Sequence, residues 1–131
     1  MHRDPYLSYL NRTTPLAMAQ LFDRFNSEIR KISQTYSEIS AMLEQCRTGL
    51  DRLAEPLLTT NATIGHKTGT GFPTPEGRIS AINDCGYVNM PNGMRYSIAV
   101  FVADSGYDMA ATSAIIADIS KIVWEQMIKQ Q

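Results

Sequence analysis

The sequence predicts an α+β fold, with a three-stranded antiparallel sheet, a long C-terminal helix packed on it and two to three N-terminal helices. Apolar residues recur at helical spacing up to about residue 60, and from Thr63 the apolar period changes to two. A final amphipathic stretch then returns to helical spacing. At 131 residues we treat the chain as one domain, helical over 1–60 and sheet plus terminal helix over 61–131.

The first helix is predicted over residues 15–26. Thr14 precedes Pro15, and proline suits the first helical position while a threonine before it suits the N-cap. A second helix is predicted over Ser33–Cys46, with a capping box that begins at Thr35. Leucines at 50, 53 and 57 suggest a short third helix, which Pro56 interrupts.

Three strands are predicted in the second half. They are Thr63–Thr70, Arg78–Met90 with a bulge near Asn83–Gly86, and Tyr96–Ala103. Residues 71–77 have the composition of a turn, and Pro91-Asn92-Gly93 signals a hairpin. The third strand is apolar on both faces, so we expect it to be covered on both sides.

The last helix is predicted over about 108–129, after a capping box that begins at Ser105. A wide apolar stripe is expected to lie on the sheet. The stripe consists of Thr112, Ile115, Ile116, Ile119, Ile122, Val123 and Met127.

Composition excludes several classes of function. A net charge of −1 gives no basic field for nucleic acid or anionic membrane, and the apolar runs are too short to span a bilayer. The N-terminus carries no apolar signal region, so we expect no secretory signal in this chain. Cys46 and Cys85 are expected to be buried free thiols. No Cys/His cluster has metal-ligand spacing, so we expect neither metal nor cofactor.

The most unusual stretch is His66-Lys67-Thr68-Gly69-Thr70-Gly71. Glycine weakens a strand interior and often marks close approach of a ligand or another backbone. Lys-Thr-Gly is also one of three signatures of the penicillin-recognising serine enzymes, although three common residues recur easily by chance.

Several further stretches, in order along the chain, resemble the C-terminal portion of a class A serine β-lactamase. They imply a partial β-lactamase/transpeptidase-like fold, and no cofactor. The matching stretches are Tyr9–Pro15, Thr48-Gly49 with Arg52-Leu53, Lys67-Thr68-Gly69, Asn83-Asp84, Ile98–Val102 and Ile115-Ile116-Ala117.

The departures from the family concern its chemistry. The nucleophile of the family lies in S-x-x-K, but none of the lysines here has a serine three residues before it. The S-D-N signature is absent from this sequence as well. We therefore expect this chain to be a C-terminal fragment without the nucleophile, S-D-N and the deacylation glutamate, and to be inactive alone.

The resemblance assigns substrate-binding roles to Lys67, Thr68, Gly69 and Thr70. Lys67 would attract the substrate carboxylate, and the Thr68 and Thr70 hydroxyls would bind it. The backbone N–H of Thr70 would form half of the oxyanion hole, while Gly69 and Gly71 would let substrate approach. Without the resemblance, we would interpret Lys67 as an exposed lysine that protects an edge strand from aggregation, and the threonines as ordinary strand-forming residues.

Some family members place an arginine near the second or third strand to help bind the carboxylate. Ile82 occupies one such place here, and Arg78 and Arg95 are poor substitutes.

Three functional interpretations remain open. The chain is the C-terminal segment of a class A β-lactamase, whose parent hydrolyses the β-lactam ring. Alternatively, it is a catalytically silent remnant that serves as a binding or assembly module, or a fragment of a penicillin-binding transpeptidase. The small-molecule partner of a full-length parent would be a β-lactam or peptidoglycan-like compound. Full-length family members are periplasmic or secreted, which leaves the location of this chain open.

The family sheet has five strands, two of them from the N-terminal end of the full chain. Without those two, Tyr96–Ala103 would be an exposed apolar edge. We therefore expect a homodimer that pairs this strand with its copy.

Overall fold

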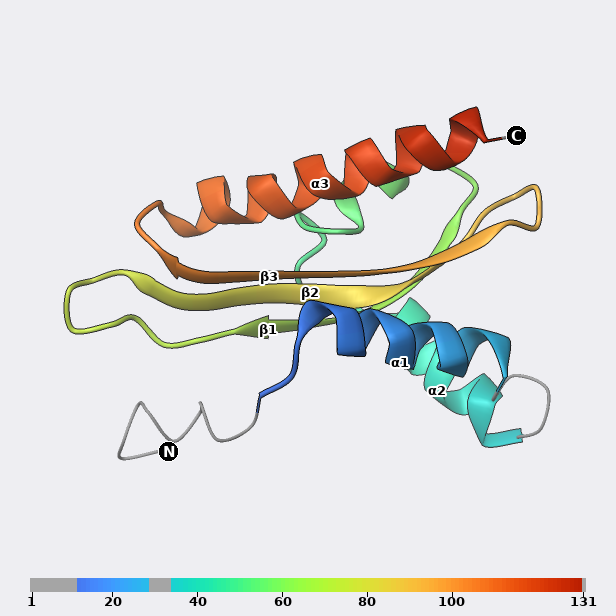
Figure 1. The fold of residues 1–131 in the computed structure, drawn as a ribbon, viewed down its shortest axis with the longest axis horizontal. Helices are drawn as coiled ribbons and strands as arrows, with labels where there is room; N and C mark the ends of the chain where they lie inside the picture. The colour runs from blue at the N-terminus through green and yellow to red at the C-terminus, as the bar shows by residue number, and fades with distance from the viewer. Residues whose placement is uncertain (1–11, 29–33, 131) are drawn as a thin grey trace.

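The computed structural model describes residues 12–28 and 34–130. A central sheet lies between two helical layers (Figure 1). Helices α1 (Pro15–Ser27) and α2 (Gln34–Glu44) lie on one face, and α3 (Met109–Lys129) lies on the other. The short 3-10 helix η3 (Glu55–Leu57) contacts α3. The predicted fold class is confirmed.

The sheet has the order β1-β2-β3 and is antiparallel throughout. Its strands are β1 (Thr63–Thr70), β2 (Ile79–Asn89) and β3 (Arg95–Ser105). Both registers run without a break through Asn83 and Gly86, so the predicted bulge is wrong. The predicted hairpin is confirmed, since Gly93 has φ +87° and donates to Met90 O at 3.0 Å.

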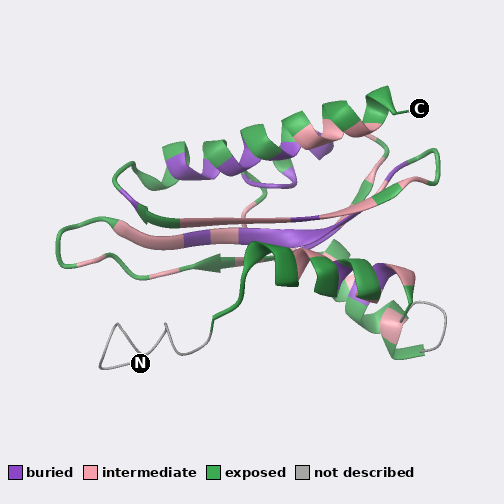
Figure 2. Cartoon of the chain, in the orientation of Figure 1, coloured by how far each residue is buried: buried purple, intermediate pink, exposed green. Residues whose placement is uncertain are grey.

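Apolar side chains pack on both faces of the sheet, and no residue of β2 is exposed, since six are buried and five are half-buried (Figure 2). Even-numbered strand residues such as Ile82 and Ile98 pack toward Ile116 of α3. Odd-numbered ones such as Cys85 and Tyr87 pack toward α1. The expectation that β3 is covered on both faces is therefore confirmed.

Two helix starts differ from the predictions. Thr14 caps α1 as expected, accepting from the Ala17 N–H at 3.1 Å. Asp108, not Ser105, caps α3, and Ser105 instead bonds to Thr112 Oγ1 at 2.8 Å. Thr35 lies inside α2, so the predicted capping box there is wrong. The predicted start of that helix, Ser33, and the family-like Tyr9–Asn11 lie outside the described residues.

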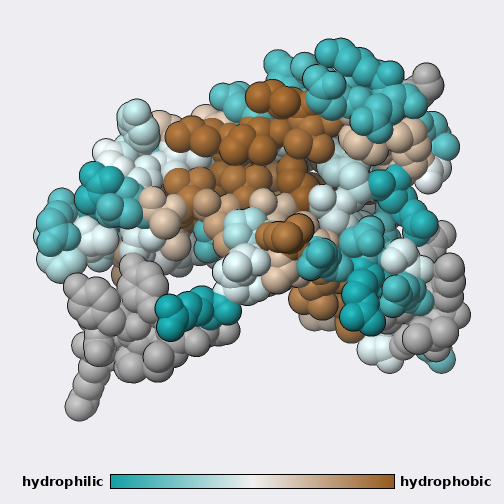
Figure 3. All heavy atoms as spheres, in the orientation of Figure 1, coloured by the Kyte–Doolittle hydropathy of each residue, from teal (hydrophilic) through white to brown (hydrophobic). Residues whose placement is uncertain are grey.

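Part of the predicted apolar stripe of α3 does not contact the sheet. Small and hydroxyl residues contact it instead, since Ser120 Oγ donates to Leu53 O at 2.8 Å and Thr112 bonds to Ser105. The buried side of α3 carries Thr112, Ile116 and Ser120, and Ile115, Ile119 and Ile122 are exposed by 40%, 37% and 59%. They contribute to an uncovered apolar area beside β3 (Figure 3).

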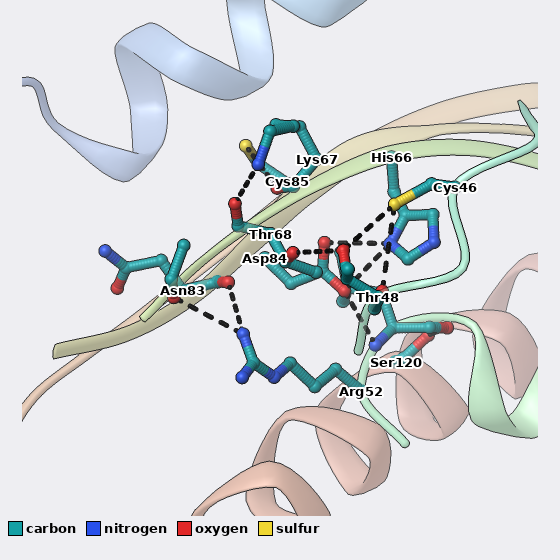
Figure 4. Close-up of polar contacts among 12 residues, drawn as sticks. Cys46, Thr48, Arg52, His66, Lys67, Thr68, Asn83, Asp84, Cys85 and Ser120 are labelled. Carbon is teal, nitrogen blue, oxygen red and sulfur yellow. Dashed lines mark hydrogen bonds and ion pairs between the residues drawn. The ribbon is translucent and has the colours of Figure 1, made fainter. Parts of the chain in front are cut away.

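A buried polar network connects β1, β2, α3 and Leu53, which lies just before η3. His66 Nδ1 lies 3.0 Å and 3.1 Å from the two carboxylate oxygens of Asp84, and both side chains are almost fully buried. The same carboxylate accepts from the Leu53 N–H at 3.2 Å. Because Ser120 bonds to the Leu53 carbonyl, the network extends to α3. Figure 4 shows these groups meeting behind β1.

Asp84→Ala tests this network. It would leave His66 and the Leu53 N–H without their acceptor in a buried site, at a cost of about 3 kcal/mol in unfolding free energy. Asp118→Ala, at an exposed position on α3, is the matched control and should change stability by less than about 0.5 kcal/mol. Urea unfolding measures both, and equal losses would contradict the network's role.

Candidate functional site

The Lys-Thr-Gly stretch lies at the end of β1, on a free edge of the sheet. The Gly71 N–H donates to Ala81 O at 2.8 Å. In this register the odd-numbered residues of β1 direct their backbone N–H and C=O groups toward β2. Backbone direction alternates along an antiparallel strand. The N–H and C=O groups of Thr68 and Thr70 therefore point outward from the sheet, toward any molecule at this edge.

Side-chain alternation divides the predicted site residues between two faces. Thr68 and Thr70 lie on the face of His66, and Lys67 lies on the opposite face beside Cys85. Lys67 is exposed, and its ammonium bends back to donate to the Thr68 carbonyl at the strand edge (Figure 4). The lysine charge and the two hydroxyls therefore approach the edge from different sides.

The two glycines differ in what surrounds them. A Cβ at Gly69 would meet no side chain closer than 3.9 Å, so open space adjoins the strand there. A Cβ at Gly71 would lie 2.2 Å from Ser80 Oγ. Packing against Ser80 therefore also favours glycine at position 71.

Arg52 is the residue that the sequence analysis missed. Its guanidinium donates to Thr70 Oγ1 at 2.9 Å, to Asn83 O at 3.1 Å and to Gly69 O at 3.3 Å. Only 6% of Arg52 is exposed, and all three acceptors are uncharged. Across residues 12–28 and 34–130, no ion pair neutralises Arg52 or Lys67.

A signal for Arg52 was available in the sequence, because it belongs to the matching Thr48-Gly49…Arg52-Leu53 stretch. Thr48 from the same stretch bonds Thr68 through the two hydroxyls, at 2.7 Å. Arg78 and Arg95 lie elsewhere, bonded to Asp104 and to the Asn26 carbonyl. Ile82 is buried in the core opposite Thr70, where it carries no charge to the site.

Neither thiol offers an evident nucleophile at this edge. Burial, with a smaller contribution from the neighbouring Asp84 charge, raises the pKa of Cys85 to about 11, although Lys67 opposes the shift. The Cys85 thiol therefore stays protonated near neutral pH and faces the Lys67 carbonyl at 3.5 Å. Cys46 is half-buried, with its sulfur 3.4 Å from Thr48 Oγ1.

Two further classes of site find no support in the described ranges. No group of three or more His, Cys, Asp or Glu side chains there could hold a metal ion. No helix in that part of the chain has the length and apolar character needed to cross a membrane.

Comparison with known proteins gives the same family along nearly the whole chain. A model of the beta-lactamase enzyme family matches residues 5–127. A β-lactamase of Phocaeicola vulgatus is 36% identical over 130 residues, which cover 98% of this chain and 40% of that protein.

Solved structures that match this chain belong to the same family. A class A β-lactamase from Bacteroides cellulosilyticus matches with a TM-score of 0.79 and 38% identity, covering 88% of this chain and 41% of that one. The TLA-3 extended-spectrum β-lactamase matches with a TM-score of 0.90 and 34% identity, covering 98% and 46%. This chain thus spans less than half the length of the relatives it matches. Together with the Lys-Thr-Gly edge, these matches place the chain in the beta-lactamase enzyme family, among its class A members.

Proposed function

We propose that this chain supplies the Lys-Thr-Gly wall of a class A β-lactamase active site, binding the substrate carboxylate at the free edge of β1. One observation carries the proposal. Two cations without a carboxylate partner, Arg52 and Lys67, lie at a strand edge whose outermost residue, Thr70, offers a hydroxyl and an outward N–H. A buried positive charge with only neutral acceptors, such as that of Arg52, favours an incoming anion.

The roles of the groups follow from their positions. Thr70 Oγ1 accepts from Arg52, so its own proton is free to be donated to a ligand carboxylate. Thr68 Oγ1 shares its hydrogen bond with Thr48 and is held in place by it. The outward N–H of Thr70 is suited to a developing oxyanion, as one of the two donors that such a site requires. Lys67 adds a positive charge from the exposed face.

Hydrolysis needs groups that this sequence does not contain. In the proposed complete site a serine attacks the lactam carbonyl, the C–N bond opens to give an acyl-enzyme, and water then releases the acid. The chain has no S-x-x-K and no S-D-N. Because catalytic groups act as a unit, the wall alone is proposed to bind but not to turn over substrate.

The inactivity is tested with a chromogenic cephalosporin. The 131-residue chain should hydrolyse it no faster than a Lys67→Ala variant, which serves as the control for adventitious hydrolysis. Turnover clearly above that control would overturn the proposal that the wall is catalytically silent alone.

Carboxylate binding is tested by titrating the chain with benzylpenicillin and following the backbone amides by NMR. The Thr68 and Thr70 amides should shift, with an affinity of order 1 mM. The methyl ester of the same penicillin lacks the negative charge and should bind roughly 10-fold more weakly. Lys67→Ala should weaken binding about 3- to 10-fold, whereas Lys121→Ala on α3 should leave it unchanged. Equal binding of acid and ester would favour the alternative of a remnant with some other role.

Arg52→Gln tests the second cation. The shorter amide removes both the charge and the hydrogen bond to Thr70 Oγ1, so benzylpenicillin binding should fall about 10-fold or more. Arg47→Gln, an exposed arginine on the same segment, is the control and should bind as the unchanged chain does. A thermal melt by circular dichroism identifies any loss that comes from unfolding, and full binding by folded Arg52→Gln would exclude Arg52 from the site.

A further inference from the structure

The turn that contains Gly49 lies against the candidate site. The Arg52 N–H donates to Gly49 O at 3.0 Å and closes the turn. Thr48, the residue before Gly49, bonds to Thr68 through the two hydroxyls at 2.7 Å (Figure 4). The Arg52 side chain donates to Thr70 Oγ1 at 2.9 Å. The two residues that bracket this turn therefore each hold one hydroxyl of the site.

No side chain fits at position 49. A Cβ built on Gly49 would lie 2.6 Å from Thr68 Cγ2 and 3.0 Å from Arg52 Cδ. Both distances are shorter than an ordinary contact between carbon atoms, which is about 3.5–4.0 Å. Gly49 also has φ +61°, a left-handed conformation that glycine adopts at little cost. Backbone conformation and space thus both favour glycine, and the space is limited by two residues of the site.

Thr68 cannot move away from such a Cβ without losing its position in the site. Its Cγ2 and Oγ1 are both attached to Cβ, so a rotation about χ1 that moves the methyl group also moves the hydroxyl. That rotation would break the hydrogen bond to Thr48 and would turn the hydroxyl away from its place at the strand edge. Steric pressure from position 49 therefore acts directly on a group proposed to bind the carboxylate.

Arg52 would be displaced as well. Its Nε would lie 3.2 Å from the added Cβ, and this buried nitrogen has no hydrogen-bond partner within the described part of the chain. The side chain would have to shift by a few tenths of an ångström. Because the guanidinium is the group that donates to Thr70, a shift of the Arg52 stem would also disturb that contact.

We propose that Gly49 is a positioning residue for the carboxylate of the ligand. Without a side chain, it lets the Thr68 hydroxyl and the Arg52 guanidinium converge on one anion. The inference rests on the proposed function, because it concerns the same site. Gly49 acts through Thr68 and Arg52, and its requirement for space can be separated from its requirement for a left-handed backbone.

Benzylpenicillin titrations of Gly49→Ala and Gly93→Ala separate these two requirements. Gly93 also has a positive φ, +87°, but a Cβ there would meet no atom within 4 Å. Both variants should lose stability in a thermal melt, since alanine strains a left-handed backbone. Only Gly49→Ala should lose binding, by at least about 10-fold, because it displaces the charged donor and the hydroxyl together. Full binding by folded Gly49→Ala, or an equal loss in Gly93→Ala, would overturn the proposal.

Gly49→Asn provides the same test if Gly49→Ala does not fold. Asparagine enters the left-handed region more readily than alanine, but it brings the same Cβ toward Thr68. This variant should fold and should also bind benzylpenicillin at least about 10-fold more weakly than the unchanged chain. Undiminished binding by Gly49→Asn would contradict the positioning role.

A second change should rescue binding. Thr68→Ser removes Cγ2, the atom nearest to the added Cβ, and keeps the hydroxyl. Compared with Thr68→Ser alone, the double variant Gly49→Ala/Thr68→Ser should bind less than about 3-fold more weakly, since changes at contacting residues are not additive. A loss as large as that of Gly49→Ala in the unchanged chain would mean that the contact with Thr68 is not the cause, and would overturn the inference.

The Thr68 rotamer tests the inference without a ligand. Three-bond couplings from the Thr68 methyl carbon to the backbone nitrogen and carbonyl carbon, measured by NMR, report χ1. Gly49→Ala should change these couplings, and Gly93→Ala should leave them as in the unchanged chain. If the unchanged chain does not bind benzylpenicillin, the proposed function fails, while a rotated Thr68 still supports the positioning role. Couplings that stay the same in Gly49→Ala would overturn the inference even where penicillin binds.

Discussion

The hydrogen bonds of the buried Asp84 carboxylate hold the rest of the structure in place. The Leu53 N–H donates to this carboxylate, and His66 Nδ1 forms a hydrogen bond with it. The Leu53 carbonyl in turn accepts from the Ser120 hydroxyl of α3. Each of these groups would be costly to bury alone, so satisfying them together fixes how four segments meet. The same contacts position Arg52, the residue before Leu53, behind Thr70. The candidate site therefore depends on a network that contacts no ligand.

The course of the strands was predictable because their signals are local. The change of period at Thr63 and the Asn92-Gly93 turn gave β1 and the β2–β3 hairpin with small errors at the ends. The buried side of α3 was not predictable from its apolar pattern, because it includes the hydroxyl residues Thr112 and Ser120, which form hydrogen bonds to Ser105 and to the Leu53 carbonyl. The isoleucine pattern alone predicts that Ile115, Ile119 and Ile122 are buried, and the hydrogen-bond partners of Thr112 and Ser120 are not visible in the sequence.

The candidate site was only partly predictable for a similar reason. Residues adjacent in sequence, Lys67 to Thr70, could be identified from their order along the chain. Arg52 lies 18 residues from the hydroxyl to which it donates, and its role depends on how the segment before β1 folds back. Arg78 and Arg95, which flank or lie on the strands, contact Asp104 and the Asn26 carbonyl instead of the site.

We propose that the Lys67–Thr70 edge is one wall of a β-lactam site whose other wall lies in a different polypeptide segment. The most direct measurement joins this chain to the part of the Phocaeicola vulgatus β-lactamase that it does not cover, and assays hydrolysis of a chromogenic cephalosporin. We expect the folded chimera to hydrolyse the cephalosporin and Lys67→Ala in the chimera to reduce the rate at least about 100-fold. A folded chimera that is inactive, or that is equally active without Lys67, would contradict it.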